Sequence, residues 1–252
     1  MKPDAERAAS DRRGSARAAL AAAGLWIALV AGASAGDRAL IDFIGYSDDA
    51  RYFAFEEFGI QDGSGFAYSS VYVVDLATDS WVLGSPVKVQ AEDEAEPLWQ
   101  VRAEAIEQAR GFIDDFGLHT PVEIAALTGD GVAAGDGKSL EFGTPPIVGR
   151  AVSDSYGLRL STFETTAATA CVEYFGAAPL GFELTLSQGT DRLVHRDASL
   201  PRSRGCPSDY RIYAVLMPFG AATLSNAVAI ISVYPGGFEG PDRRFLAVPL
   251  GF

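Results

Sequence analysis

Cysteine and histidine are scarce, with two residues of each among 252. The two histidines, His119 and His195, leave few candidates for a general base. A zinc centre would need both of them together with Cys171 and Cys206, four scattered residues without a CxxC motif. The sequence therefore predicts no metal site and no cofactor.

Long apolar runs are few as well. Residues 18–30 form a run of 13 residues, whereas a helix that crosses a bilayer needs about 20. Basic residues precede this run, and Ala33, Ser34 and Ala35 follow it. This order predicts a signal peptide, residues 1–35, cut after Ala35, and its length disfavours the alternative of a membrane anchor. The pair Arg12 and Arg13 leaves the export route open, general secretory or twin-arginine.

Positive charge is the third shortage, because the chain carries a formal net charge of −13. Loss of residues 1–35 would leave 15 of the 20 Lys and Arg and 30 of the 33 Asp and Glu, a net charge of −15. Such an acidic surface repels phosphate backbones and anionic headgroups, which excludes nucleic acid as a partner. The sequence predicts a secreted or periplasmic protein with one domain, 36–252, and no membrane span after cleavage.

Both cysteines fall in the exported part. In an oxidising compartment they predict one disulfide, Cys171 to Cys206, which closes a loop of 35 residues. By the chain-entropy argument such a loop stabilises the fold by roughly 3–4 kcal/mol. A reactive or metal-binding thiol is the alternative.

Alternating and β-branched segments dominate residues 36–252, and they predict a mainly β fold of antiparallel sheets. One stretch differs: apolar residues recur every three or four positions between Pro97 and Gly117, which predicts an amphipathic helix that covers a sheet face. The expected arrangement is two packed sheets, sandwich-like or incomplete propeller-like. The expected strands are 40–45, 51–58, 71–76, 146–153, 158–164, 171–175, 182–187, 210–216, 227–234 and 245–250, with another possible near Ile124.

Two resemblances bear on residues 43–81. The segments SDDARYFAF and VYVVDLATDSW resemble a single TolB-type propeller repeat, although Asp48 replaces its proline, Ala50 replaces its glycine, and no period of about 40 residues follows. More widely, GYSDDARYFAFEEFGIQDGSGFAYSSVYVVDLATDSW, PRSRGCPSDYRI and GGFEGPDRRFLAV resemble a family of predicted secreted bacterial proteins of unknown function. This resemblance implies export and a shared fold, and it implies no activity.

A short sequence pattern occurs near both ends of the chain. Residues 49–55 and 242–248 share the pattern D-x-R-[FY]-[FL]-A-[FV]. One hypothesis is that both belong to equivalent hairpins that lie near each other, and the alternative is coincidence.

Charged residues supply the candidate binding site. Glu56 and Glu57 must point to opposite faces of a strand, and Glu56 is expected to be a buried acid paired with Arg51 or Arg244. Arg202 and Arg204 flank the expected disulfide, and their guanidinium groups suit either a carboxylate, phosphate or glycan ligand or the protein's own acids.

Three catalytic or metal motifs are incomplete. Residues 129–139 resemble a phosphate loop, but Val132 stands where the motif needs glycine. The same stretch fits an EF-hand loop from Asp130 to Glu141 without side-chain oxygens at its third and fifth positions. His195 lies two residues before Asp197, an arrangement that would also suit a base oriented by a carboxylate.

These observations favour a non-catalytic binding or envelope-associated module for an unidentified envelope or extracellular ligand or protein. The alternative is a hydrolase of cell-envelope polymers that uses acidic residues, for which a pair of carboxyl groups at a set separation would be needed. A fold stabilised by calcium at Asp130 to Glu141 is a third hypothesis.

Overall fold

The structure, a computed structural model, describes residues 36–129, 135–144, 153–237 and 239–251. Its central layer is a four-stranded antiparallel sheet in the order β13-β12-β11-β6. The side chains of β12 are buried on both faces along most of the strand, which requires a layer on each side. The strands of this central sheet are β6 (Val122–Leu127), β11 (Pro207–Pro218), β12 (Val228–Pro235) and β13 (Arg244–Pro249).

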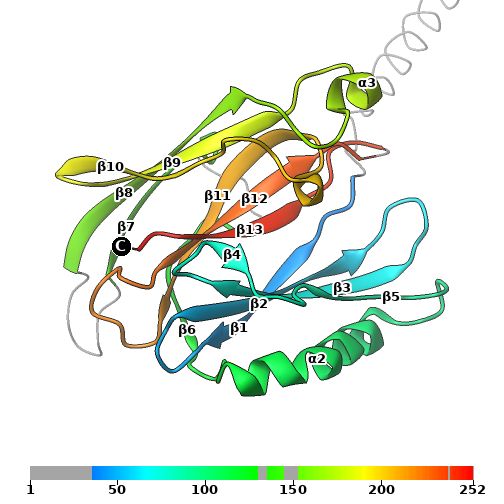
Figure 1. Cartoon of the computed structure of the whole chain (residues 1–252), viewed down its shortest axis with the longest axis horizontal. Coiled ribbons are helices and arrows are strands. Elements are labelled where there is room, and N and C mark those ends of the chain that lie inside the picture. The colour runs from blue at the N-terminus through cyan, green and yellow to red at the C-terminus, as the bar shows by residue number, and fades with distance from the viewer. Residues whose placement is uncertain (1–35, 130–134, 145–152, 238, 252) are drawn as a thin grey trace, which may run out of the picture. The chain divides into compact units, whose positions relative to one another are not determined.

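A five-stranded sheet covers one face of the central sheet (Figure 1). Its order is β1-β2-β3-β4, and β5 also pairs with β3. Aromatic side chains such as Phe53, Phe55 and Tyr72 form the core between the two sheets, against Leu216 and Ile230 of the central sheet. The strands of this helix-side sheet are β1 (Leu40–Tyr46), β2 (Tyr52–Ile60), β3 (Ala67–Asp75), β4 (Ser80–Trp81) and β5 (Val87–Gln90).

The third sheet covers the other face of the central sheet, in the order β10-β9-β8-β7. Leu158, Phe182 and Leu184 point inward from it and pack against Ile212 and Ile231. Its strands are β7 (Ser139–Thr144), β8 (Ser153–Glu164), β9 (Leu180–Gln188) and β10 (Thr190–Arg196). We call it the outer sheet.

Helix α2 (Leu98–Asp115) lies on the far face of the helix-side sheet (Figure 1). Pro97 is its N-cap, and Gly117 follows its end with a φ of 59°, a conformation that glycine adopts without strain. Val101, Ala105 and Ala109 form its buried stripe. The predicted amphipathic helix and its position over a sheet face are thereby confirmed.

The mainly β, antiparallel fold class is confirmed, and the described residues form three sheets rather than the expected two. One expected strand is wrong: Cys171–Phe175 is a helical turn, α3, ended by Gly176 at a φ of 71°. Its β-like composition does not decide its structure, because Val172, Tyr174 and Phe175 stay exposed and have no sheet to join. Most of the expected strand 146–153 lies outside the described residues.

The hypothesis of equivalent hairpins is wrong. The turn at 49–51 joins β1 to β2, whereas residues 242–244 lead into β13 of a different sheet. The two turns also lie at opposite ends of these layers. Asn226, just before β12, donates to the carbonyl of Ala50, while Phe245 at the start of β13 contacts Glu57 near the end of β2.

The first described residues do pair with the last strand. Arg38 and Arg243 form a parallel bridge, in which the Arg243 N–H donates to the Asp37 carbonyl at 2.7 Å and the Ala39 N–H donates to the Arg243 carbonyl at 3.3 Å. The short segment 37–39 therefore begins a further strand beside β13 before the chain turns into β1 of the helix-side sheet.

Candidate functional site

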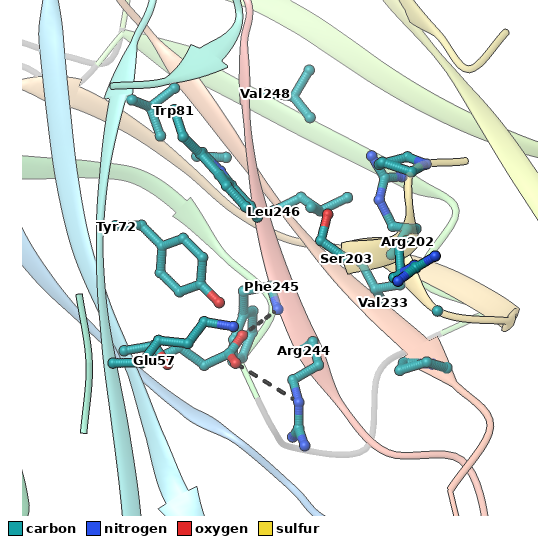
Figure 2. A pocket seen from close by; sticks show the side chains of 18 of the residues that line it. Glu57, Tyr72, Trp81, Arg202, Ser203, Val233, Arg244, Phe245, Leu246 and Val248 are labelled. Atoms are coloured by element: carbon teal, nitrogen blue, oxygen red, sulfur yellow. Dashed lines mark hydrogen bonds and ion pairs between the residues drawn. The ribbon is translucent and has the colours of Figure 1, made fainter. Parts of the chain in front are cut away.

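A cleft of about 720 Å³ opens where the three sheets meet along one side (Figure 2). Its floor is β13, the edge strand of the central sheet. One wall comes from β3, β4 and β5 of the helix-side sheet, and the other comes from β10 and the loop at 201–205. This volume falls in the usual range for sites that hold a small molecule or a short chain segment.

Glu57 lies where the floor meets the helix-side wall, and the residue is 3% exposed. Its carboxylate accepts the N–H of Phe245 at 2.8 Å and lies 3.8 Å from Nε of Arg244 (Figure 2). Burial raises the pKa of Glu57 to about 7, although Arg244 and the Phe245 N–H act in the opposite direction. The cleft thus holds a carboxyl group that exchanges its proton near neutral pH.

Strand register sets the helix-side wall. Glu57 pairs with Ser70 in β3, and Ser70 pairs with Lys88 in β5, so the three side chains form a row on the face turned to β13. Tyr72 and Trp81 continue this wall with ring centroids 5.3 Å apart. Trp81 is 41% exposed, so this wall offers an aromatic surface beside a lysine.

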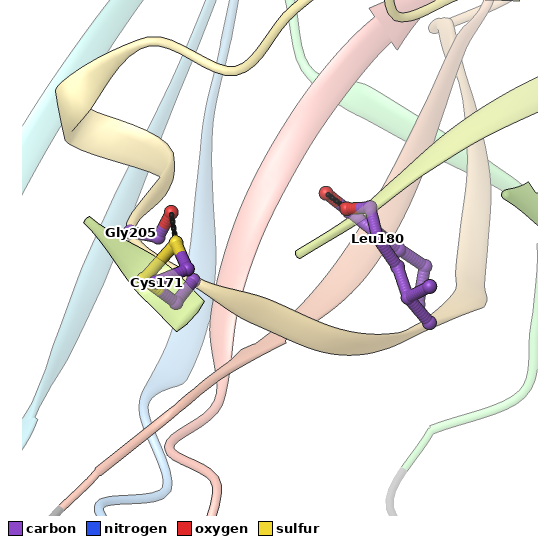
Figure 3. Close-up of a disulfide and its surroundings, with 5 residues drawn as sticks. Cys171, Leu180 and Gly205 are labelled. Atoms are coloured by element: carbon purple, nitrogen blue, oxygen red, sulfur yellow. Dashed lines mark hydrogen bonds between the residues drawn. A yellow bond between two sulfur atoms is a disulfide. The ribbon is translucent and has the colours of Figure 1, made fainter. Parts of the chain in front are cut away.

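The opposite wall is built by a short loop that the disulfide holds. Arg202–Arg204 forms a 3-10 turn, and Cys206 next to it is bonded to Cys171 of α3 (Figure 3). The predicted disulfide is confirmed. Gly205 adopts a φ of 65° and a ψ of −140°, a backbone conformation that is strained for any residue other than glycine. The bond and the glycine together fix the path of the loop and leave Arg202 exposed at the mouth of the cleft.

His195 joins the two walls. Its Nδ1 lies 3.5 Å from the carboxylate of Asp79, in the turn before β4, and its Nε2 lies 3.2 Å from Asp197, after β10. Burial disfavours the charged imidazole, but hydrogen bonds to both carboxylates outweigh it and raise the pKa of His195 to about 9. At neutral pH the imidazolium therefore links the outer sheet to the helix-side sheet.

The charge of the cleft is opposite to that of the chain. Five cationic side chains line it against two acidic ones, in a protein with a net charge of −13. Three of the five have acidic partners: Arg204 lies 3.4 Å from Asp197, Arg244 pairs with Asp37 at 2.7 Å, and His195 is held as described. Among the described residues, no carboxylate forms an ion pair within 4.0 Å of Lys88 or Arg202, although the charge of Lys88 is near enough to lower the pKa of Glu57.

Comparison with protein families identifies the family of this chain. A family model described as a predicted secreted protein (DUF2259) matches residues 54–250. The chain belongs to this family. Members of DUF2259 have no established function, and their description as secreted confirms the predicted localisation, secreted or periplasmic. Comparison with curated proteins found no match.

The stretch matched by DUF2259 contains every residue that lines the cleft. In the described part of the chain, no helix is long and apolar enough to cross a membrane. That part also holds no cluster of three or more His, Cys, Asp or Glu side chains that could bind a metal ion. Residues 130–134 of the possible calcium loop lie outside the described residues.

The cleft brings together three of the five predicted binding residues. Arg202, Arg204 and Arg244 line it, although they lie in two separate stretches of this DUF2259 chain. Glu56 and Arg51 do not. Arg51 pairs with Asp75 at 2.7 Å on the surface near the β1–β2 turn.

Glu56 is a buried, paired acid as expected, but its partner is neither Arg51 nor Arg244. The guanidinium of Arg102, on helix α2, binds both oxygens of its carboxylate at 2.6 to 3.1 Å, and Ser69 donates to it at 2.8 Å. Glu56 and Glu57 do point to opposite faces of β2, as the alternation predicted. The glutamate in the cleft is therefore Glu57.

Sequence reasoning missed Lys88 and Trp81, and it considered His195 only as a catalytic base or a zinc ligand. The segment Val87–Gln90 alternates apolar and polar residues, V-K-V-Q, and this was the available signal for a strand that presents Lys88 on one face. No local pattern places that strand against β13, which follows more than 150 residues later.

Proposed function

We propose that this protein is an exported binding module that captures an anionic ligand in the cleft. The observation that carries the proposal is the reversal of charge: a strongly acidic chain gathers five cationic side chains around one cleft. Among the described residues, Lys88 and Arg202 form no ion pair within 4.0 Å. A hydrogen bond between a charged donor and an anionic ligand contributes about 1.5–3 kcal/mol, more than a neutral one.

The shape of the cleft supports binding as well. The disulfide and the ion pairs of Arg204 and His195 hold the wall in place, so little ordering is needed when a ligand enters. The aromatic pair Tyr72 and Trp81 offers an apolar surface opposite the arginine. A ligand that combines negative charge with apolar groups fits both.

The test uses two acidic polymers as probes, polygalacturonate and poly-L-glutamate, with dextran as a neutral control. Binding to the purified protein is measured by calorimetry at two salt concentrations. The double variant Lys88→Ala with Arg202→Ala should bind at least one acidic probe about 100-fold more weakly, since two charged contacts are lost.

A charge-matched control makes this test specific. Arg110 on α2 and Arg159 on the outer sheet are exposed and lie outside the cleft. Replacing both by alanine changes the net charge by the same amount and should alter the affinity less than about threefold. Equal losses in the two double variants, or no binding of either probe to the unaltered protein, would refute the proposal.

Glu57 supports a second candidate function, the hydrolysis of an envelope polymer. A carboxyl group with a pKa of about 7 can both donate and accept a proton at neutral pH, as a general acid or base must. Glu57→Gln should then abolish release of reducing ends or amines from a polymer that the cleft binds, without weakening the binding. Turnover that survives this substitution would exclude Glu57 as the acid.

A further inference from the structure

The floor of the cleft is a sheet edge with open hydrogen-bonding positions. Leu250 donates its N–H to the carbonyl of Ala227 at 2.8 Å, and the register pairs Val248 with Ala229 and Leu246 with Ile231. In an antiparallel ladder, hydrogen-bonded pairs alternate with non-bonded pairs. The even-numbered residues of β13 therefore bond to β12, and the odd-numbered ones turn their N–H and C=O groups away from it, toward the free edge.

The protein itself occupies the start of this edge. Arg243, the odd-numbered residue just before β13, exchanges backbone hydrogen bonds with the segment 37–39, as described above. The N–H of Phe245, the next one, is taken by the carboxylate of Glu57. The chain thus begins a fifth strand on the central sheet, and Glu57 then bonds the next amide in place of a backbone carbonyl.

The rest of the edge is open. Among the described residues, no hydrogen-bond partner is present for the outward C=O of Phe245 or for the outward N–H and C=O of Ala247. Pro249, the last outward position, has no N–H and closes the open stretch, as proline does on edge strands. We call the stretch from Phe245 to Pro249 the open edge.

The cleft follows the open edge and not one face of the sheet. Phe245 and Ala247 point toward the helix-side sheet, Leu246 and Val248 point toward the outer sheet, and all four line the cleft. Figure 2 shows β13 running between Tyr72 and Trp81 on one side and Arg202 and Ser203 on the other. The space beside β13 is therefore where the next strand of the central sheet would lie, between the two flanking layers.

We propose that the ligand of the cleft is an extended segment of another polypeptide, which pairs with Ala247 and adds a strand to the central sheet. This inference rests on the proposed function and names its ligand class. Free strand edges bind extended peptides through main-chain hydrogen bonds, and pockets for alternate side chains supply the specificity. At about 3.4 Å per residue, the open edge spans roughly 14 Å and accommodates about four or five residues.

The walls define the sequence of this segment. Side chains of an added strand alternate between the two walls. Those that face the helix-side sheet meet Tyr72 and Trp81, which favours apolar or aromatic residues. Those that face the opposite wall meet the exposed Arg202, which favours aspartate or glutamate. The partner is thus an acidic segment with apolar residues at every second position.

The experiment uses fluorescein-labelled nine-residue peptides in which glutamate alternates with valine and phenylalanine. The complete protein should bind such a peptide in fluorescence anisotropy titrations, and Arg202→Ala should weaken the binding, because the glutamates face this arginine. Two N-methylated forms then test the backbone. Methylation of every second amide in one register should lower the affinity about tenfold or more, and methylation in the other register should lower it less than threefold, because only one set of amides faces β13.

Two measurements on the protein complete the test. Ala247→Pro removes the outward N–H and no ladder bond to β12, so it should weaken peptide binding about tenfold at an unchanged melting temperature. In the unaltered protein, hydrogen exchange at the Ala247 amide should slow when the peptide binds. This exchange measurement decides the matter if the proline variant folds poorly.

The outcomes separate this inference from the proposed function. If polygalacturonate or poly-L-glutamate binds through Lys88 and Arg202 while N-methylation in either register is without effect and the Ala247 amide stays unprotected, the ligand is anionic but is not an added strand. The inference then fails and the proposed function stands. If neither the acidic polymers nor the peptides bind, both fail.

Discussion

Glu56 and Glu57 are neighbours in β2 with exposed fractions of 2% and 3%, yet they meet opposite surroundings. Glu56 points toward helix α2, where Arg102 binds both of its oxygens and Ser69 donates a hydrogen bond. Glu57 points toward β13, where it has one amide N–H and a more distant arginine, and burial raises its pKa to about 7. The comparison distinguishes a closed face of the helix-side sheet from an open one.

The difference shows how one sheet serves two purposes. On the closed face, the ion pair with Arg102 compensates the buried charge of Glu56, and the apolar stripe of α2 covers the sheet beside it. On the open face, the same residue type is left partly unsatisfied beside a cleft, with its proton exchangeable at neutral pH. Perturbed groups of this kind gather at functional sites because packing alone would not retain them.

The largest expected effect on stability comes from breaking the ion pair between Glu56 and Arg102 on the closed face. Arg102→Met removes the guanidinium, which lies over the ring of Phe58 and pairs with Glu56, and so leaves the Glu56 carboxylate buried without its partner. The free energy of unfolding should fall by about 3–5 kcal/mol, measured by urea denaturation at pH 7. Addition of Glu56→Gln to this variant should restore part of the loss.

A control on the same helix makes the result specific. Arg110 forms an exposed pair with Glu107, so Arg110→Met should cost less than about 0.5 kcal/mol. Equal losses for the two methionine variants would show that Arg102 does not satisfy a buried charge.

A smaller effect, dependent on pH, concerns the open face. The pKa of Glu57 is about 7 in the folded protein, above its usual value of 4.5, so the folded state binds the extra proton between these values. Stability should therefore fall as the pH rises from about 4.5 to 8, by on the order of 3 kcal/mol. Glu57→Gln, whose amide oxygen can still accept the Phe245 N–H, should remove this slope between pH 4.5 and 6.5 in urea denaturation series.

The corresponding substitution at Glu56 should have a different effect on the pH dependence of stability. Glu56→Gln should destabilise the protein at every pH in this range, since it removes a partner of Arg102. Parallel pH curves for Glu57→Gln and the unaltered protein would contradict the assignment of a neutral-pH carboxyl group to the cleft.

The smallest expected effect has a slope of the same sign, at higher pH. The pKa of His195 is raised to about 9 from 6.5, so its stabilisation is complete below pH 6.5 and disappears as the pH rises through 9. His195→Gln should lower the free energy of unfolding by on the order of 2 kcal/mol at pH 6, because partial exposure weakens the ion pairs, and by almost nothing at pH 10. His119→Gln, an exposed histidine, should show no such dependence.

Local sequence patterns predicted the strands and the helix better than they predicted which side chains meet in the folded protein. Period-two alternation placed Glu56 and Glu57 on opposite faces, and the three-and-four spacing placed the stripe of α2, because both follow from backbone geometry alone. Arg102 as the partner of Glu56 lies 46 residues away and depends on how a helix packs on a sheet. No local signal identifies such a pair.

The cleft was beyond sequence reasoning for the same reason. Its residues come from β2, β5, the loop at 201–205 and β13, which meet only through the pairing of three sheets. The two cysteines did locate the loop, because an exported pair predicted the bond that holds Arg202 in place. The short strand with Lys88 and the edge at Ala247 carry no distinctive composition.

The pairing of segment 37–39 with Arg243 also has a kinetic consequence. These contacts join residues more than 200 positions apart, and the same final strand is the floor of the cleft. Such distant contacts form late, since the long intervening loop must close first. The central sheet cannot be completed until residues 241–250 have been synthesised. A nascent chain interrupted before that point would therefore have no cleft.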